Sequence, residues 1–163
     1  MTSSGTDVLL RAGTDQDANA IADIWHRGWH DGHDGLVPPE LVEARTEESF
    51  TRRARAKVED TTVAVVEGEI AGFVLVADDE VELVFVSSAH RGTGVAPALI
   101  RAAERQVGEA GYSTAWLAVV AGNARARAFY ERSGWVDEGP FTYDADTENG
   151  SIAVPCHRYV KDV

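Results

Sequence analysis

Cysteine is almost absent from this sequence: among its 163 residues there is one, Cys156. A single cysteine cannot form an intrachain disulfide, and it excludes zinc modules built from paired cysteines. The sequence also lacks a basic or apolar segment over residues 1–7, and it has no uncharged apolar run near the ~20 residues that cross a bilayer. These absences predict a cytoplasmic protein with no secretory leader and no membrane partner.

Positive charge is scarce as well. Fifteen Lys and Arg stand against 27 Asp and Glu, which gives a formal net charge of -12 and a pI near 4.7. This balance argues against binding to nucleic acid through its phosphates, and it would attract a cationic substrate. The same acidity also suits a protein whose surface charge serves only solubility. Length and composition are typical of one globular domain, which we expect over residues 1–163.

Apolar periodicity divides the chain into seven strand-like and four helix-like segments, with glycines near several ends. The strands are expected at 8–11, 62–67, 70–77, 80–87, 115–120, 136–143 and 152–160, and the helices at about 14–32, 40–57, 95–110 and 124–133. The acidic tract 144–150 is expected to be a loop. Hairpin-linked strands followed by a strand–helix–strand crossover predict an α/β (α+β) fold. Its mixed sheet is mostly antiparallel, with a central parallel pair and helices on both faces.

A glycine-rich turn joins the strand at 80–87 to the helix at 95–110. Gly92 and Gly94 allow a tight turn, while free amides and the helix dipole favour an anion such as a phosphate. No nearby lysine completes a P-loop, and Pro97 stands where a dinucleotide-binding fingerprint has its third glycine. The turn therefore predicts a phosphorylated cofactor of another class, with a purely structural turn as the alternative.

Two segments carry a family resemblance. Val81–Val86 followed by Arg91-Gly92-Thr93-Gly94-Val95-Ala96 resembles the central strand and the [Q/R]-x-x-G-x-[G/A] motif of the GNAT superfamily of N-acetyltransferases. Asn123–Trp135 resembles the N-x-x-A-x-x-F-Y-x-x-x-G-[F/W] segment of the same family, and the order of elements agrees along essentially the whole chain. The resemblance implies a sheet whose two central parallel strands splay apart, with acetyl-CoA in the opening.

The resemblance also implies which residues hold acetyl-CoA. Main-chain groups around Phe85 and Val86 would pair with the pantetheine arm, and Asn123 would help to hold it. Arg125 or Arg127 could assist at the pyrophosphate. Pro97 removes one amide and is expected to weaken this site slightly. The pyrophosphate would lie on the main chain of the glycine turn, at Arg91, Gly92, Thr93, Gly94, Val95 and Ala96.

Acetylation of an amine needs a base for the amine, whose pKa is about 10.4, and an acid for the departing thiolate. In regular alternation Glu80 and Glu82 share a face with Val84 and Val86. We expect Glu82 to be the base because it is closer to the opening. Glu80 is the alternative because a bulge could change which carboxylate points inward, and both could also be solvated surface charges. Tyr130 matches the family tyrosine that lies near the sulfur, so the resemblance implies that it is the acid.

The resemblance places the acceptor near the end of the first helix and the C-terminal strands. The expected site is acidic and aromatic and suits a cationic primary amine of a small molecule or an exposed lysine. It comprises Trp29, His30, Asp31, Asp34 and Tyr143 or residues 144–150. His26 and His30 have a metal-ligand spacing, but no H-E-x-x-H pattern exists and no metal is expected.

Three further expectations complete the interpretation. Cys156 has no base partner in the sequence and is expected to be a small buried hydrophobe. Ala118 stands where many relatives that acetylate protein N-termini carry a glutamate, which disfavours that activity. The alternative function is a catalytically silent acyl-CoA-binding module, and a homodimer formed by the C-terminal strands is an analogy with the family.

Overall fold

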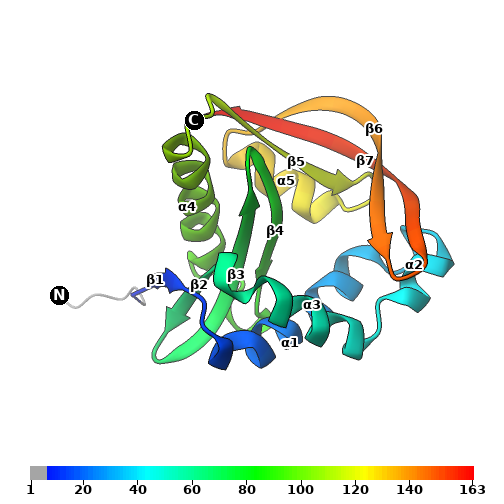
Figure 1. The fold of residues 1–163 in the computed structure, drawn as a ribbon. Helices are drawn as coiled ribbons and strands as arrows, with labels where there is room; N and C mark the ends of the chain where they lie inside the picture. Colours follow the sequence, from blue (N-terminus) through cyan, green and yellow to red (C-terminus); the bar gives the residue numbers. More distant parts are fainter. Residues whose placement is uncertain (1–6) are drawn as a thin grey trace.

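The computed structural model describes residues 7–163. A seven-stranded sheet runs through the molecule, and helices cover both of its faces (Figure 1). The absence of a leader, predicted from residues 1–7, concerns residues that lie outside the described part except for Asp7. Among the described residues, no helix is both long enough and apolar enough to cross a bilayer.

The sheet has the strand order β1-β2-β3-β4-β5-β7-β6. All neighbouring strands are antiparallel except β4 and β5, which are parallel. This confirms the predicted mixed sheet. The strands are β1 (Leu9–Ala12), β2 (Thr61–Val66), β3 (Glu69–Ala77), β4 (Glu80–Val86), β5 (Thr114–Val120), β6 (Val136–Thr147) and β7 (Gly150–Asp162).

Two hydrophobic cores lie on opposite faces of the sheet. One packs under the N-terminal helices and is centred on Trp25, Phe50 and Phe73. The other packs under α4 and α5 and contains Leu99 and Tyr159, both fully buried. The helices are α1 (Ala18–His33), α2 (Pro39–Ala44), α3 (Glu47–Lys57), α4 (Val95–Glu109) and α5 (Ala124–Arg132), with short 3-10 turns η1 (Asp15–Asp17), η2 (Val58–Asp60) and η3 (Ser88–His90).

The parallel strands β4 and β5 pair with each other only near their N-terminal ends. Glu80 pairs with Trp116, and the Trp116 N–H donates to the Asp79 carbonyl at 3.0 Å. Beyond this point no β4 residue pairs with β5, and the two strands diverge in Figure 1. This confirms the splayed central pair. The consequence is a stretch of β4 main chain that has a free edge on the side of β5.

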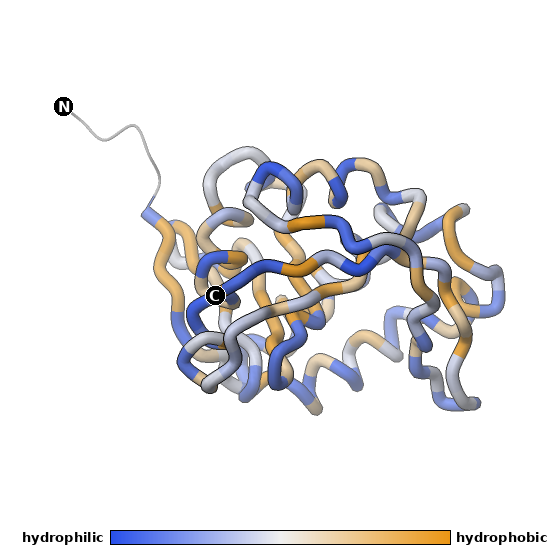
Figure 2. Tube along the Cα trace, turned by 90° about the horizontal axis from the view of Figure 1, so that it is seen from above, coloured by the Kyte–Doolittle hydropathy of each residue, from blue (hydrophilic) through white to orange (hydrophobic). Residues whose placement is uncertain are grey.

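Two expected elements are wrong in part. The helix expected at 40–57 is broken into α2 and α3, because Thr46 adopts an extended conformation and its side chain accepts the Ser49 N–H at 3.1 Å. This is an N-cap, which satisfies an otherwise free amide at the start of a helix. The tract 144–150 is not a loop, since residues up to Thr147 belong to β6 and pair with β7. Both hydrophilic and hydrophobic residues occur along the segment that leads to the C-terminus (Figure 2).

A β-bulge interrupts β4. Leu75 of β3 pairs with Leu83 and Val76 pairs with Val81, so Glu82 has no partner in the ladder. The bulge invalidates the expectation of regular alternation along this strand. Val84 and Val86 pack into the α4 core with Val81, whereas Leu83 and Phe85 pack into the α1 core.

Candidate functional site

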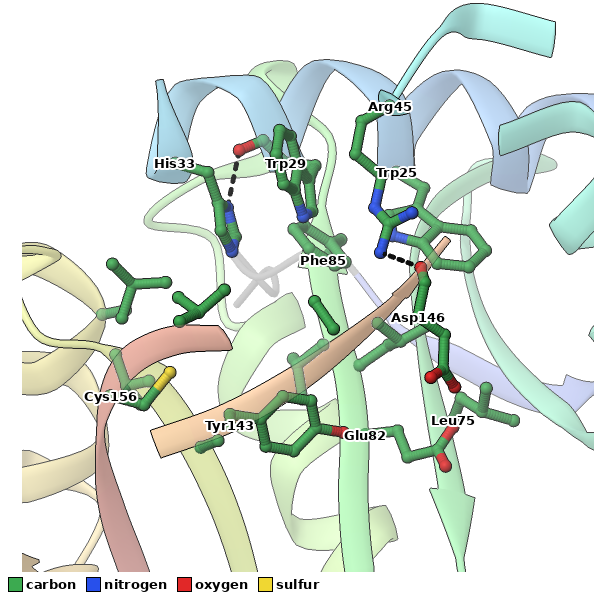
Figure 3. Close-up of a pocket in the computed structure, with 18 of the residues that line it drawn as sticks. Trp25, Trp29, His33, Arg45, Leu75, Glu82, Phe85, Tyr143, Asp146 and Cys156 are labelled. Carbon is green, nitrogen blue, oxygen red and sulfur yellow. Dashed lines mark hydrogen bonds between the residues drawn. The ribbon is translucent and has the colours of Figure 1, made fainter. Parts of the chain in front are cut away.

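A cavity of about 410 Å³ opens where β4 and β5 separate. Its wall combines residues from α1, α3, α5 and the C-terminal hairpin with both splayed strands (Figure 3). The predicted site residues in this wall are Trp29, Glu80, Glu82, Phe85, Asn123, Tyr130 and Tyr143. The splay therefore brings together the two candidate bases, the candidate acid and part of the expected acceptor site.

Two carboxylates from β4 face the cavity. The Tyr143 hydroxyl donates a hydrogen bond to a Glu80 carboxylate oxygen at 2.9 Å. Burial raises the pKa of Glu80, the bond from Tyr143 opposes the rise, and the nearby charge of Glu82 adds to it. The bulge leaves Glu82 without a ladder partner and in the same cavity wall. Both carboxylates therefore reach the cavity, contrary to their expected place on the face of Val84 and Val86.

Tyr130 lies on the opposite side of the opening, on α5. Its ring packs against Trp135 and Tyr159, with centroids 6.2 Å away in both cases. Burial raises the pKa of the Tyr130 phenol, so it is fully protonated at neutral pH. The cavity therefore contains a proton acceptor on β4 and a proton donor on α5.

The glycine turn has the geometry that an anion site requires. Gly92 and Gly94 have φ angles of +76° and +91°, which residues with a side chain rarely adopt. No atom lies within 4 Å of the position that a Cβ would occupy on either glycine, so the space above the turn is open. The turn ends at Gly94, the N-cap of α4, where first-turn amides have no partner within the helix.

A second cavity, of about 540 Å³, adjoins the glycine turn. It lies between α4 and the end of α5. Arg101 and Arg132 in its wall suit a phosphorylated ligand, whereas Lys161 forms an ion pair with Glu104, which lines the same cavity. Its wall contains Gly92, Gly94, Ala96, Pro97, Arg101, Arg132 and Lys161. The donors and the open space around the glycines therefore fit the phosphates of a coenzyme A.

Three predicted ligands of the cofactor have partners within the protein. Asn123 caps α5 by accepting the Ala126 N–H at 3.2 Å, and it also lies in the cavity wall. Arg91 forms an ion pair with Asp31 at 2.9 Å. Arg127 donates to the Ala121 carbonyl, to Tyr159 and to Asp137 at 3.0 to 3.1 Å. Because Arg127 is engaged in this network, the expectation that it assists at the pyrophosphate has no support.

The expected acceptor site divides into two parts. Trp29 and Tyr143 lie in the cavity wall, together with residues 144–146. His30, Asp31 and Asp34 are not in this wall. His30 contacts Asp34 at 2.7 Å and the Arg45 carbonyl at 2.9 Å through its two ring nitrogens.

His33 and Cys156 also line the cavity, and both are uncharged at neutral pH. The His33 ring stacks on Trp29 with a centroid distance of 4.3 Å, and its Nδ1 lies 2.7 Å from the Trp29 carbonyl (Figure 3). Burial lowers the pKa of His33 to about 4. Burial also raises the pKa of Cys156 to about 11, which suits the expected buried hydrophobe. In residues 7–163, no cluster of three or more His, Cys, Asp or Glu side chains suits a metal ion.

Sequence reasoning missed two arginines in the cavity wall, Arg45 and Arg53. The sequence could have indicated Arg53, because its spacing from Phe50 and Ala54 places all three residues on one face of α3. Phe50 and Ala54 are both buried, so this face is the inner one. Arg45 has no such signal, because it lies in the break between α2 and α3. Its burial depends on the C-terminal hairpin, where the Asp146 carbonyl accepts its Nη2 hydrogen at 2.7 Å.

Comparison with known proteins adds independent findings. The model of the acetyltransferase (GNAT) family matches residues 19–135. No curated protein matches this chain in sequence. The GCN5-related N-acetyltransferase from Rhodopseudomonas palustris has a similar structure, with a TM-score of 0.73 and 21% identity, over 100% of this chain and 99% of that chain.

Two similar structures contain the coenzyme. The PaiA N-acetyltransferase from Thermoplasma acidophilum, in complex with coenzyme A, has a TM-score of 0.67 and 15% identity over 96% of this chain and 99% of that chain. The yncA protein from Salmonella typhimurium, with its cofactor acetyl-CoA, has a TM-score of 0.67 and 15% identity over 96% of this chain and 94% of that chain. At these identities the likeness concerns the fold.

Proposed function

This chain belongs to the GNAT acetyltransferase family, and from that premise we propose that it transfers an acetyl group from acetyl-CoA to a primary amine. The acceptor is a small molecule or an exposed lysine. One observation carries the proposal: a single cavity between splayed strands has carboxylates of β4 and the phenol of Tyr130 in its wall. A base and an acid on opposite sides of one opening suit a reaction that removes one proton and returns another.

Coenzyme A would lie along the opening. The first-turn amides of α4 and the glycine turn would hold the pyrophosphate, through the main chain of Arg91, Gly92, Thr93, Gly94, Val95 and Ala96. The free edge of β4 at Phe85 and Val86 would bind the pantetheine arm as an added strand, beside Asn123. Acetyl-CoA supplies the acetyl group and a thiolate leaving group.

Glu82 would act as the general base. An ammonium acceptor must lose a proton before its nitrogen can form a bond to the acetyl carbon, and a carboxylate in the cavity wall can take that proton. A backbone amide near Val86 would polarise the thioester carbonyl. Glu80 is the alternative base, but its hydrogen bond with Tyr143 already occupies one carboxylate oxygen.

Tyr130 would act as the general acid. When the new C–N bond forms, the C–S bond breaks and the sulfur leaves as a thiolate, whose conjugate acid has a pKa of about 8.5. Burial raises the pKa of Tyr130 and keeps the phenol protonated until the thiolate appears. The acceptor nitrogen loses two protons in all: one balances the proton gained by the sulfur, and the other reaches solvent through Glu82.

The acceptor would enter at the end of the cavity formed by Trp29 and Tyr143. Glu80, Glu82, Asp144 and Asp146 line this cavity, and their negative charge would attract an ammonium group. His30, Asp31 and Asp34 would act only at the entrance, because they lie outside the cavity wall. A cytoplasmic location and a homodimer belong to the same proposal.

The test measures free thiol released from acetyl-CoA with a panel of primary amines and with neutral alcohols of matched shape. We expect thiol release with amines only. Glu82→Gln should lower kcat/KM by about a hundredfold or more, and Tyr130→Phe should lower kcat, while both variants still bind coenzyme A in a calorimeter. Glu69→Gln is a matched control, because this exposed strand glutamate is not in the cavity wall.

Unchanged rates in both variants would refute the assigned base and acid. Coenzyme A binding without thiol release from any acceptor would favour the silent acyl-CoA-binding module instead. No preference for amines over the matched alcohols would refute the proposed acceptor class.

A further inference from the structure

Two arginines in the cavity wall lack partners for part of their guanidinium groups. Arg45 is 5% exposed, and its Nε has no hydrogen-bond partner. The Nη1 of Arg53 is also buried and also has no partner. Neither arginine forms an ion pair with any residue in the described range 7–163. Arg45 is therefore a buried cation and Arg53 a partly buried one. The charge of Asp146 acts on both and that of Glu82 on Arg53, but neither carboxylate forms an ion pair with them.

An unpaired buried charge is unfavourable, because the group gives up its hydration without a compensating contact. Burial lowers the pKa of Arg53, but only to about 10, so the group stays charged at neutral pH. Arginine cannot reduce the penalty by losing its proton in this range. A pair of such groups in one cavity therefore favours an anion that enters from outside.

Contacts on their other sides hold both arginines in place. The Nη2 of Arg45 donates to the Asp146 carbonyl at 2.7 Å, a bond drawn as a dashed line in Figure 3. The Arg53 guanidinium lies 4.4 Å from the centroid of the Trp25 ring. A cation stacked on an aromatic face keeps the N–H edges of the guanidinium in one direction. The two groups are thus positioned before any ligand arrives.

The arginines share the cavity with the candidate bases. Glu82 acts electrostatically on Arg53, and both residues line the same space as Glu80 and Tyr143. The cavity therefore presents two kinds of charge to one acceptor. Negative charge comes from the carboxylates of β4, and positive charge comes from Arg45, in the break between α2 and α3, and from Arg53 in α3. A ligand that satisfies both must itself carry both charges.

We propose that Arg45 and Arg53 bind a carboxylate of the acceptor, so that the substrate is an amino acid whose amine lies toward Glu82. This inference rests on the proposed function, because it names the substrate class of the same site. Guanidinium N–H groups match the two oxygens of a carboxylate in geometry and charge. The proposed site also changes the expected acceptor from a simple cation to a zwitterion, whose carboxylate would accept hydrogen bonds from the two arginines.

The experiment compares matched acceptors on the full chain. Initial rates of thiol release from acetyl-CoA are measured with L-amino acids and ω-amino acids, each beside its carboxamide and its decarboxylated amine. For at least one amino acid we expect a kcat/KM at least about tenfold above that of its amide, since each hydrogen bond to a charged group contributes this much or more. Equal rates for every acid and its amide would overturn the inference.

Substitution of Arg53 tests whether this side chain binds the carboxylate of the acceptor. Arg53→Gln should lower kcat/KM for the preferred acid by about tenfold or more and lower the value for its amide by a clearly smaller factor. Arg55→Gln is the matched control, because it is exposed on the same helix and absent from the cavity wall. Arg53→Lys keeps the positive charge but loses the paired N–H groups of the guanidinium. It should therefore retain more of the preference for the acid over its amide than Arg53→Gln does. A fall that is equal for acid and amide would indicate a structural role and contradict the proposal.

Binding measurements separate this inference from the proposed reaction. Calorimetric titration of the protein with coenzyme A present should show that the preferred acid binds and that its amide binds at least about tenfold more weakly. If the acid binds selectively but no thiol is released, the proposed reaction fails while the carboxylate site stands. If amines are acetylated without regard to a carboxylate, the reaction stands and the carboxylate site fails.

Discussion

Adding one methyl group to Gly72 and to Gly108 should change stability in opposite directions. A Cβ on Gly72 would lie 2.7 Å from the Phe85 carbonyl oxygen, 3.0 Å from Leu99 Cδ1 and 3.3 Å from Val86 Cα. Two of these neighbours belong to the main chain of β4, and Leu99 is fully buried. A Cβ on Gly108, in α4, has no neighbour closer than 3.8 Å.

The magnitudes follow from these distances. Gly72→Ala forces β3 and β4 apart at the end of their ladder, and overpacking of this kind costs about 1 to 3 kcal/mol. For a chain of 163 residues this corresponds to a fall in Tm of roughly 2 to 12 °C. Gly108→Ala meets no clash and reduces the freedom of the unfolded chain inside a helix. It should therefore stabilise the protein by about 0.5 to 1 kcal/mol.

Urea denaturation of both variants gives the free energy of unfolding, and calorimetric titration gives the affinity for coenzyme A. We expect Gly72→Ala also to bind coenzyme A more weakly, because the atoms that must move belong to Phe85 and Val86, the residues proposed to pair with the pantetheine arm. Gly108→Ala should bind it as the unmodified protein does. If Gly72→Ala were as stable as Gly108→Ala, the close approach of β3 and β4 would be wrong. A destabilised Gly72→Ala with full affinity would refute the added-strand interpretation.

Two further predictions concern stability. The folded-state pKa of Glu80 is raised above its unfolded value of about 4.3, so the stability that this group contributes is present at low pH and is lost as pH rises through the folded pKa. Relative to the unmodified protein, the free energy of unfolding of Glu80→Gln should thus increase as pH rises above about 4.3. Urea titrations from pH 4 to 8 measure this difference. The control Glu40→Gln, at an exposed position, should follow the unmodified protein. Thr46→Ala removes the N-cap of α3 and should lower the free energy of unfolding by about 1 kcal/mol. Thr51→Ala, in the same helix, should change it by less than about 0.5 kcal/mol. Equal losses in the two variants would argue against the cap.

The sequence by itself determined the elements and the glycine turn. Apolar periodicity and turn residues are local properties, so they located the strands and helices to within a few residues, apart from the break at Thr46 and the paired tract 144–147. The family motifs on both sides of the opening likewise lie in continuous segments. The mixed sheet, the splayed strands and the family were therefore predictable.

Tertiary structure alone decided how the cavity is charged. The bulge at Glu82 depends on how β4 pairs with β3, so an alternating pattern predicted the wrong face. Arg45 is buried because the Asp146 carbonyl, 101 positions away, accepts its hydrogen bond. The sign of a methyl addition at Gly72 or Gly108 likewise depends on atoms from other elements. Contacts between distant segments leave no periodic signal in the chain, and these contacts determine which charges an acceptor meets.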